Sequence, residues 1–141
     1  MLKSLFLVMI FTFSAIASES VAFIKSAQGD AVVKRENTVI PAQKGVALFT
    51  KDILQTGASG SMGVSFNDGT RIAVGSKSIL VIDNYLFAPS QKDFRFDLNL
   101  QKGTAVFESG KISKLAPEKV HFKVPQGVIG IRGTKFVVEA E

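Results

Sequence analysis

Histidine and carboxylate side chains are the groups in this sequence that could carry acid–base or metal chemistry. The chain has one histidine, His121, and no cysteine. Apolar and polar residues alternate over 120–124, so His121 is expected on the solvent side of a strand or in a cross-strand contact. A calcium site uses clustered carboxylates, whereas the aspartates here are scattered along the chain. Asp30, Asp52, Asp68, Asp83 and Asp93 are well separated, and the sixth, Asp97, is expected with Asp93 on the exposed polar face of a strand. The sequence therefore predicts a protein that is not an enzyme and holds no cofactor or metal.

Two glycine-rich segments resemble active-site motifs only superficially. Gly57-Ala-Ser-Gly-Ser61 has serine where the nucleophile elbow of serine hydrolases has its last glycine, and no helical pattern follows. Gly127–Gly133 lacks the Gly-x-Gly opening and the following helix of a dinucleotide-binding loop. We interpret the first segment as a turn and assign no cofactor to the second.

Positive charge gathers locally toward the end of a chain whose formal net charge is +5. Four lysines fall within thirteen residues: Lys111, Lys114, Lys119 and Lys123. A solvated face is the simplest interpretation, and attraction to an anionic wall polymer or lipid surface is the alternative. Nucleic acid is not favoured as a partner, because tryptophan is absent and there is one tyrosine to stack on bases.

The N-terminus has the three-part pattern of a secretory signal peptide. Lys3 precedes an apolar run over 5–13, and Ala15-Ile-Ala17 supplies the small residues of a cleavage site. An uncleaved anchor is the alternative, although a spanning helix needs about 20 apolar residues. We expect cleavage after residue 17 and a periplasmic or secreted location. Removing 17 of the 141 residues leaves 124, which suits one domain over 18–141.

The rest of the chain has the pattern of an all-β domain, a sandwich or a solenoid-like roll of many short strands. The alternation over 94–100 predicts a strand that buries Phe94, Phe96, Leu98 and Leu100 on one face. Further short strands are expected on β-branched and aromatic content. Their ranges are 21–25, 31–35, 46–49, 53–56, 104–108, 120–124 and 135–139.

Three other segments have distinct patterns. Strands over 61–66 and 71–74 flank Asp68-Gly69, which predicts a hairpin whose tight turn uses positive φ angles. The continuous apolar run over 79–82 predicts a strand covered on both faces at the centre of the core. Residues 109–117 are expected to form a loop or a short helix, with Ile112 and Leu115 on one turn.

Several segments, taken in order, resemble the FecR-type periplasmic domain. They are Asp52–Gly57, Val64–Gly75 with Ser78, and Gly127–Val138. The segments 29–35 and 100–106 also fit the family pattern of a strand led in by glycine. The resemblance covers about 21–138, and Ile131-Arg-Gly-Thr-Lys-Phe136 is its most specific part.

The residues of these motifs have physical interpretations of their own. Asp68 and Gly69 are turn residues. In the Arg132-Gly133-Thr134 sequence, the glycine is expected where φ is positive or where a side chain would clash. Arg132 lies among apolar residues, so its guanidinium is expected to be partly buried, either as a structural latch or as a partner contact.

The resemblance implies a regulator that receives a signal from an outer-membrane receptor and passes it to a sigma factor. The sequence shows no anti-sigma segment, spanning helix or further receptor-like domain, so we expect a freestanding module. The leading hypothesis is an exported, non-catalytic module that binds another envelope protein, with a role in signal sensing. The alternative is a passive structural protein that binds anionic polymer or lipid through its lysines. The oligomeric state is left open.

Overall fold

Strands make up most of the computed structural model, which describes residues 19–131 and 133–140. The strands are β1 (Ala22–Gln28), β2 (Ala31–Arg35), β3 (Thr38–Pro41), β4 (Ala47–Leu48), β5 (Ile53–Thr56), β6 (Ser61–Phe66), β7 (Arg71–Val74), β8 (Ile79–Ala88), β9 (Asp93–Glu108), β10 (Val120–Val124), β11 (Gly127–Gly130) and β12 (Lys135–Ala140). The helical segments are η1 (Pro89–Gln91), α1 (Lys111–Leu115) and η2 (Pro117–Lys119). None of the helices in this part of the chain is long and apolar enough to span a membrane.

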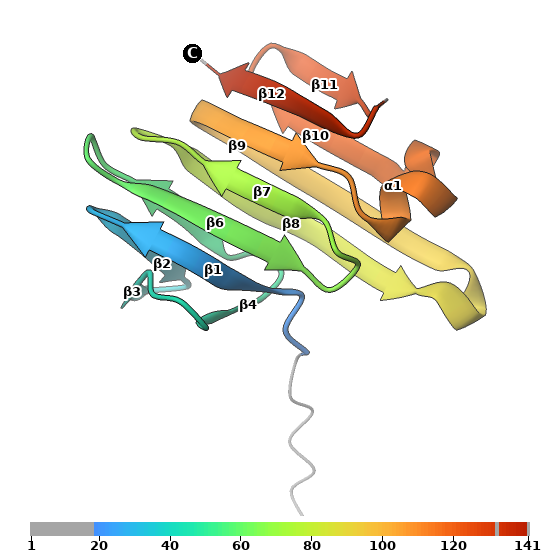
Figure 1. Cartoon of the computed structure of the whole chain (residues 1–141), viewed down its shortest axis with the longest axis horizontal. Helices are drawn as coiled ribbons and strands as arrows, with labels where there is room; N and C mark the ends of the chain where they lie inside the picture. The colour runs from blue at the N-terminus through green and yellow to red at the C-terminus, as the bar shows by residue number, and fades with distance from the viewer. Residues whose placement is uncertain (1–18, 132, 141) are drawn as a thin grey trace, which may run out of the picture.

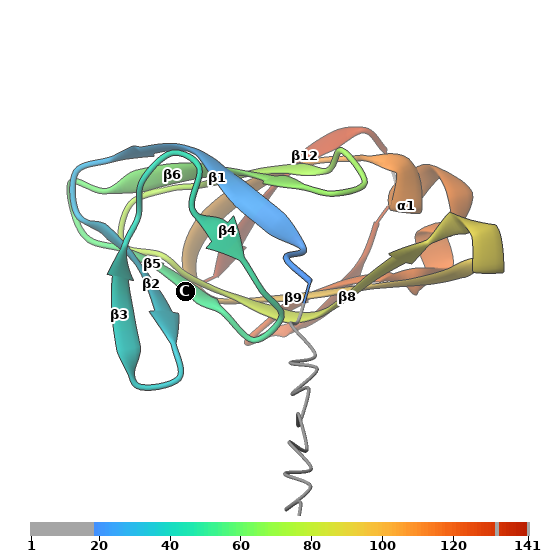
Figure 2. The ribbon, with the colours of Figure 1, turned by 90° about the horizontal axis from the view of Figure 1, so that it is seen from below.

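The strands form two facing layers that share one long strand, β9 (Figures 1 and 2). Layer A, which faces the reader in Figure 1, has the order β4-β1-β6-β7-β9-β12. Layer B has the order β3-β2-β5-β8-β9-β10-β11. Most neighbours are antiparallel, but β9 and β10 are parallel. The all-β prediction of a sandwich or roll is confirmed.

Strand β9 passes from layer B to layer A, and the alternation of its buried residues changes at the crossing. Up to Leu100 the even-numbered residues are buried, whereas beyond the crossing Ala105 and Phe107 are buried instead. The parity changes because the strand is irregular at the crossing: its register with β8 goes from Leu80↔Leu100 to Ile79↔Lys102, and the extra residue, Gln101, reverses which side chains face the core. Gly103 lies at the crossing with φ +93°, a conformation that glycine adopts at little cost.

The core lies between the two layers and is rich in phenylalanine. Phe66 from layer A packs on Tyr85 and Phe96 from layer B, with ring centroids 5.2 Å and 4.8 Å away. Phe107 and Phe122 make a second contact between the layers, 6.2 Å apart. Each such side chain stabilises the fold by about 1.5–3 kcal/mol when fully buried. These rings hold the two sheets together.

Most of the predicted strands are confirmed. Those over 31–35, 53–56, 61–66, 71–74 and 120–124 have the predicted bounds, and Phe94, Phe96, Leu98 and Leu100 are buried as expected. The predictions over 94–100 and 104–108 are wrong in one respect, because both belong to the continuous strand β9. The strands β3 and β11 were not predicted, and β8 extends six residues beyond the predicted end at Ile82.

The predicted β6–β7 hairpin is confirmed, but its turn differs from the expectation. Gly69 has φ +88°, whereas Asp68 is not left-handed. The backbone N–H of Gly69 donates to the carbonyl of Phe66, and the N–H of Phe66 donates to the carbonyl of Thr70. This is a three-residue loop with one left-handed glycine, a common hairpin connection that leaves Asp68 free to turn its side chain inward.

The structure adds detail to the predictions for residues 79–82 and 109–117. In β8, Leu80 and Ile82 are fully buried in the core, and Val81 on the opposite face is also buried, so the strand is covered on both faces as predicted, although Val81 is not part of the core cluster. Residues 111–115 do form a short helix, in which Ile112 is buried and Leu115 is exposed. The predicted signal peptide over 1–17 lies outside the described residues.

Candidate functional site

Asp68 is a buried carboxylate that connects the β6–β7 turn to two other elements. Its side chain is 1% exposed and accepts four hydrogen bonds. Two come from the N–H and hydroxyl of Thr70, at 3.2 and 2.8 Å. The others come from the Tyr85 hydroxyl of β8, at 3.0 Å, and from the Ile112 N–H of α1, at 3.0 Å. The Asp68 carbonyl also accepts from the N–H of Lys111, at 2.9 Å. Asp68 therefore positions α1 against the sandwich.

The Tyr85 hydroxyl both donates to and accepts from Asp68, since the backbone N–H of Asp68 donates to it at 2.9 Å. Burial of the phenol, together with the nearby Asp68 carboxylate, raises the pKa of Tyr85 well above its ordinary value. The hydroxyl is therefore held in its neutral form, as a structural donor.

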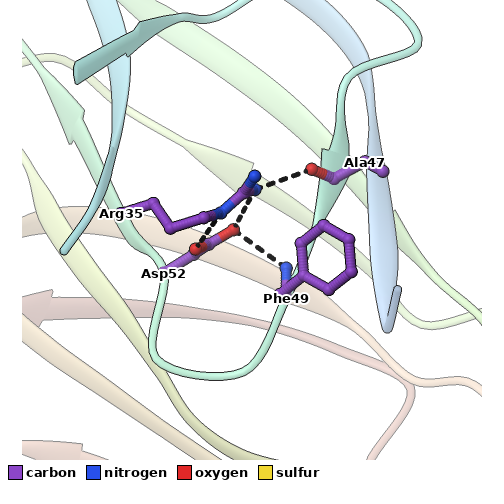
Figure 3. A network of polar contacts seen from close by, with 4 residues as sticks. All are labelled: Arg35, Ala47, Phe49 and Asp52. Atoms are coloured by element: carbon purple, nitrogen blue, oxygen red, sulfur yellow. Dashed lines mark hydrogen bonds and ion pairs between the residues drawn. The ribbon is translucent and has the colours of Figure 1, made fainter. Parts of the chain in front are cut away.

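A second buried carboxylate, Asp52, directly precedes β5 and pairs with Arg35 of β2 (Figure 3). The Arg35 guanidinium donates to both Asp52 oxygens, at 2.9 and 2.7 Å, and to the carbonyl of Ala47, at 3.0 Å. The N–H of Phe49 donates to Asp52, at 2.8 Å, and the Phe49 ring lies 4.6 Å from the guanidinium carbon. The hydrogen bond to Asp52 raises the pKa of Arg35. The forked pair lies between the neighbouring strands β2 and β5 of layer B, and the bond from Arg35 to the Ala47 carbonyl links β2 to β4 of layer A.

A third polar cluster fixes the point where β9 changes layer. The hydroxyl of Ser78 accepts from the N–H of Thr104, at 3.0 Å, and the N–H of Ser78 donates to the Thr56 hydroxyl, at 3.0 Å. Gly103 lies so close to Ser78 that an added Cβ would be 2.6 Å from the Ser78 Cα. The three polar clusters, around Asp68, Asp52 and Ser78, each connect separate elements and so stabilise the fold.

The two predicted motif segments lie on either side of residues 109–111, because the Asp68 carbonyl accepts from Lys111 and the carbonyls of Gly133 and Thr134 accept from Ser109. Asp68 and Gly69 are in the β6–β7 turn, whereas Gly133 and Thr134 are exposed just before β12. Gly133 has φ +102°, as expected for that glycine, and an added Cβ there would meet nothing within 4 Å. Arg132, for which a latch and a partner contact were both considered, lies outside the described residues.

The four predicted surface lysines are all exposed and occupy three elements. Lys111 and Lys114 are in α1, Lys119 ends η2, and Lys123 is in β10. His121, also in β10, makes the expected cross-strand contact, with its Nδ1 2.8 Å from a carboxylate oxygen of Asp97. No group of three or more His, Cys, Asp or Glu side chains among residues 19–131 and 133–140 could hold a metal ion.

The outer face of layer A has a hollow of about 270 Å³ that sequence patterns did not indicate. Its floor follows the register across β6, β7 and β9, where Gly63, Ala73 and Val106 lie side by side. Glycine has no side chain and alanine has only a methyl group, so the surface of the sheet at Gly63 and Ala73 is recessed relative to the longer side chains around it. Val137 of β12 continues the same row and is 61% exposed.

Charged side chains form the rim of this hollow. In the next row of the sheet, Arg71, Glu108 and Lys135 are consecutive register partners on β7, β9 and β12, and Lys25 of β1 lies on another side. All four are exposed. The salt bridges found in the described part of the chain involve other residues, namely Arg35 with Asp52 and His121 with Asp97. The rim therefore has three cations to one carboxylate, which favours an anionic ligand.

The arrangement defines a β-sandwich domain that has a hollow with a basic rim on the outer face of layer A. A family model described as FecR protein matches residues 52–141, more than half of the chain, so this protein belongs to the FecR family. That family is regulatory rather than enzymatic, is associated with the envelope and acts with envelope partners in signalling. The comparisons with curated proteins and with solved structures found no match. Strands β1–β4 precede the matched residues, although β1 supplies Lys25 to the hollow.

Proposed function

We propose that this protein is an exported, non-catalytic FecR-type module that binds another envelope protein. Membership of a regulatory family supports this function, and the hollow on layer A is the observation that carries it. At about 270 Å³ it is smaller than the pockets of about 300–1,000 Å³ that enclose drug-sized ligands. Its size suits one or two anchoring side chains of a protein partner.

The chemistry of the rim defines the kind of partner. An apolar side chain would pack on Gly63, Ala73 and Val106, while carboxylates beside it would meet Arg71 and Lys25. Such a surface combines an apolar floor with a charged rim. In protein interfaces the buried apolar centre contributes affinity, and complementary charges around it contribute specificity. The partner is therefore a protein with an acidic surface segment. If that partner is a membrane receptor, the binding event becomes a step in signal sensing.

Affinity capture from an envelope extract tests this function when it includes a matched pair of variants. Arg71→Glu reverses a charge at the hollow, and Lys123→Glu makes the same change on layer B. We expect an envelope protein to be retained by the wild type and by Lys123→Glu, and to be lost with Arg71→Glu. If no specific protein is captured, or if both variants retain it equally, the hollow is not the binding surface.

The second candidate function is passive association with anionic wall polymer or lipid. The exposure of Lys111, Lys114, Lys119 and Lys123 favours it. Sedimentation with vesicles that contain anionic lipid measures this attraction, which added salt screens. Under this alternative, Lys114→Glu combined with Lys119→Glu abolishes vesicle binding and Arg71→Glu leaves it unchanged.

The periplasmic or secreted location rests on the signal-peptide pattern of residues 1–17. The intact mass of the protein from the envelope fraction tests it. We expect a mature chain that begins at Ser18. A mass that includes Met1 would instead favour the uncleaved anchor.

A further inference from the structure

Strand β12 forms an open edge of layer A. It pairs with β9 along one side, and no other described strand pairs with it. The other edges are short or interrupted: β4 has two residues, β3 ends in Pro41, and β11 begins and ends in glycine. Proteins commonly protect sheet edges with short strands or proline. β12 has six residues without proline or glycine, so it has neither of these protections.

The exposed face of β12 has a charge pattern that is complementary to itself. Lys135, Val137 and Glu139 alternate with the more buried Phe136, Val138 and Ala140. In an antiparallel pair of two β12 strands centred on Val137, residue 135 of each strand lies opposite residue 139 of the other. A lysine then meets a glutamate on both sides of the central valine pair, and such opposite-charge pairs stabilise a sheet.

We propose that two copies of this chain associate through antiparallel pairing of their β12 strands, so that layer A continues across a two-fold axis. In this dimer Lys135 lies opposite the partner subunit's Glu139, and Val137 lies opposite the partner's Val137. The interface is isologous, as expected for the commonest kind of homodimer. Phe136 is half-buried and stacks on Phe107, with centroids 4.9 Å apart, so pairing also covers the edge of the core.

The charge sequence along β12 distinguishes a second copy from an unrelated strand. A partner strand would need an acidic, an apolar and a basic residue in alternating positions, and an antiparallel copy of β12 supplies this order. The proposal does not depend on the function proposed for the hollow. Lys135 belongs to both surfaces, but the dimer forms by backbone pairing along the edge of β12, and Val137 and Glu139 do not line the hollow.

Sedimentation equilibrium of the protein purified from its envelope fraction tests the dimer. Val137→Lys places two like charges opposite each other at the two-fold axis and is expected to weaken association by about tenfold or more. The matched control is Val128→Lys on the other edge strand, β11, since Val128 is 59% exposed and Val137 is 61% exposed. The control is expected to dimerise like the wild type.

A charge exchange tests the register. Lys135→Glu and Glu139→Lys each create like-charge pairs and are expected to weaken the dimer. The double variant restores opposite charges and is expected to recover it. A wild-type protein that remains monomeric up to about 1 mM overturns the proposal. So does a dimer that Val137→Lys leaves unchanged or that the double charge exchange fails to restore.

Discussion

Asp68 connects three elements that are far apart in the sequence. Its partners Tyr85 and Ile112 are 17 and 44 residues away. A buried carboxylate is stable only when its oxygens are paired, and here four donors satisfy them. The same side chain therefore holds the hairpin, β8 and α1 in one arrangement.

Asp68→Ala is expected to lower the free energy of unfolding by about 3 kcal/mol or more, because it leaves buried N–H and O–H donors without acceptors. Chemical denaturation followed by circular dichroism measures the change. Asp93→Ala is the control at an exposed aspartate and should change stability by less than about 0.5 kcal/mol. Equal effects of the two substitutions would show that Asp68 does not have this role.

Tyr85 is the one tyrosine of the chain, so its ionisation can be followed directly. Its raised pKa means that the folded protein keeps the phenol proton while the unfolded chain releases it near pH 10. Its contribution to stability is therefore fully present below about pH 10, and the free energy of unfolding falls as the pH rises further.

We expect the folded protein to show no tyrosinate absorbance at about pH 11 and to gain it when it unfolds. In Tyr85→Phe the fall in stability above pH 10 should be smaller than in the wild type. Reversible ionisation of Tyr85 near pH 10 in the folded protein would contradict the buried contact with Asp68.

Sequence reasoning identified Asp68 and Gly69 as turn residues but not the inward direction of the Asp68 side chain. An aspartate before glycine is typical of turns, and local patterns hold no information about a hydroxyl 17 residues away. The Arg35–Asp52 pair was missed for the same reason, since the two residues are 17 apart in the sequence and meet only where β2 pairs with β5.

Among the elements, β9 determines the architecture, because it belongs to both layers. Its half over 94–100 was predicted from strict alternation, and its second half was predicted as a separate strand. Gly103 and the change of parity account for this error. The alternation of buried and exposed residues is interrupted where the strand crosses between layers, and in the sequence this interruption looks like the end of a strand.

Gly103→Ala is expected to lower the free energy of unfolding by about 3 kcal/mol, since the residue would be left-handed and its Cβ would overlap Ser78. Gly130→Ala is a suitable control, because an added Cβ meets nothing within 4 Å there. Thermal unfolding compares the two variants. A Gly103→Ala protein as stable as Gly130→Ala would mean that the crossing tolerates a side chain.

The strands that sequence patterns missed are the weakest by composition. β3 ends in proline and β11 is bounded by glycines, and both residues are unfavourable in strands. Each forms by pairing with a neighbour, β3 with β2 and β11 with β10. Tertiary pairing therefore outweighs local propensity at these edges.

At the scale of the whole molecule, the hollow depends on register rather than on any motif. Its floor and rim come from β1, β6, β7, β9 and β12, so no short window of sequence contains them. The sequence indicated the basic cluster over 111–123 instead, because those lysines are neighbours in the chain. The sheet brings Lys25, Arg71 and Lys135 around one hollow only when its strands are assembled.

Photo-crosslinking in intact cells tests most directly whether this hollow binds a protein partner. The photoreactive residue replaces Ala73 on the floor or, as a control, Val39, which is 58% exposed on β3 of layer B. We predict an adduct with another envelope protein from position 73, lost when Arg71→Glu is added and absent from position 39. The absence of an adduct with another protein from position 73, or the same adducts from both positions, would contradict the account.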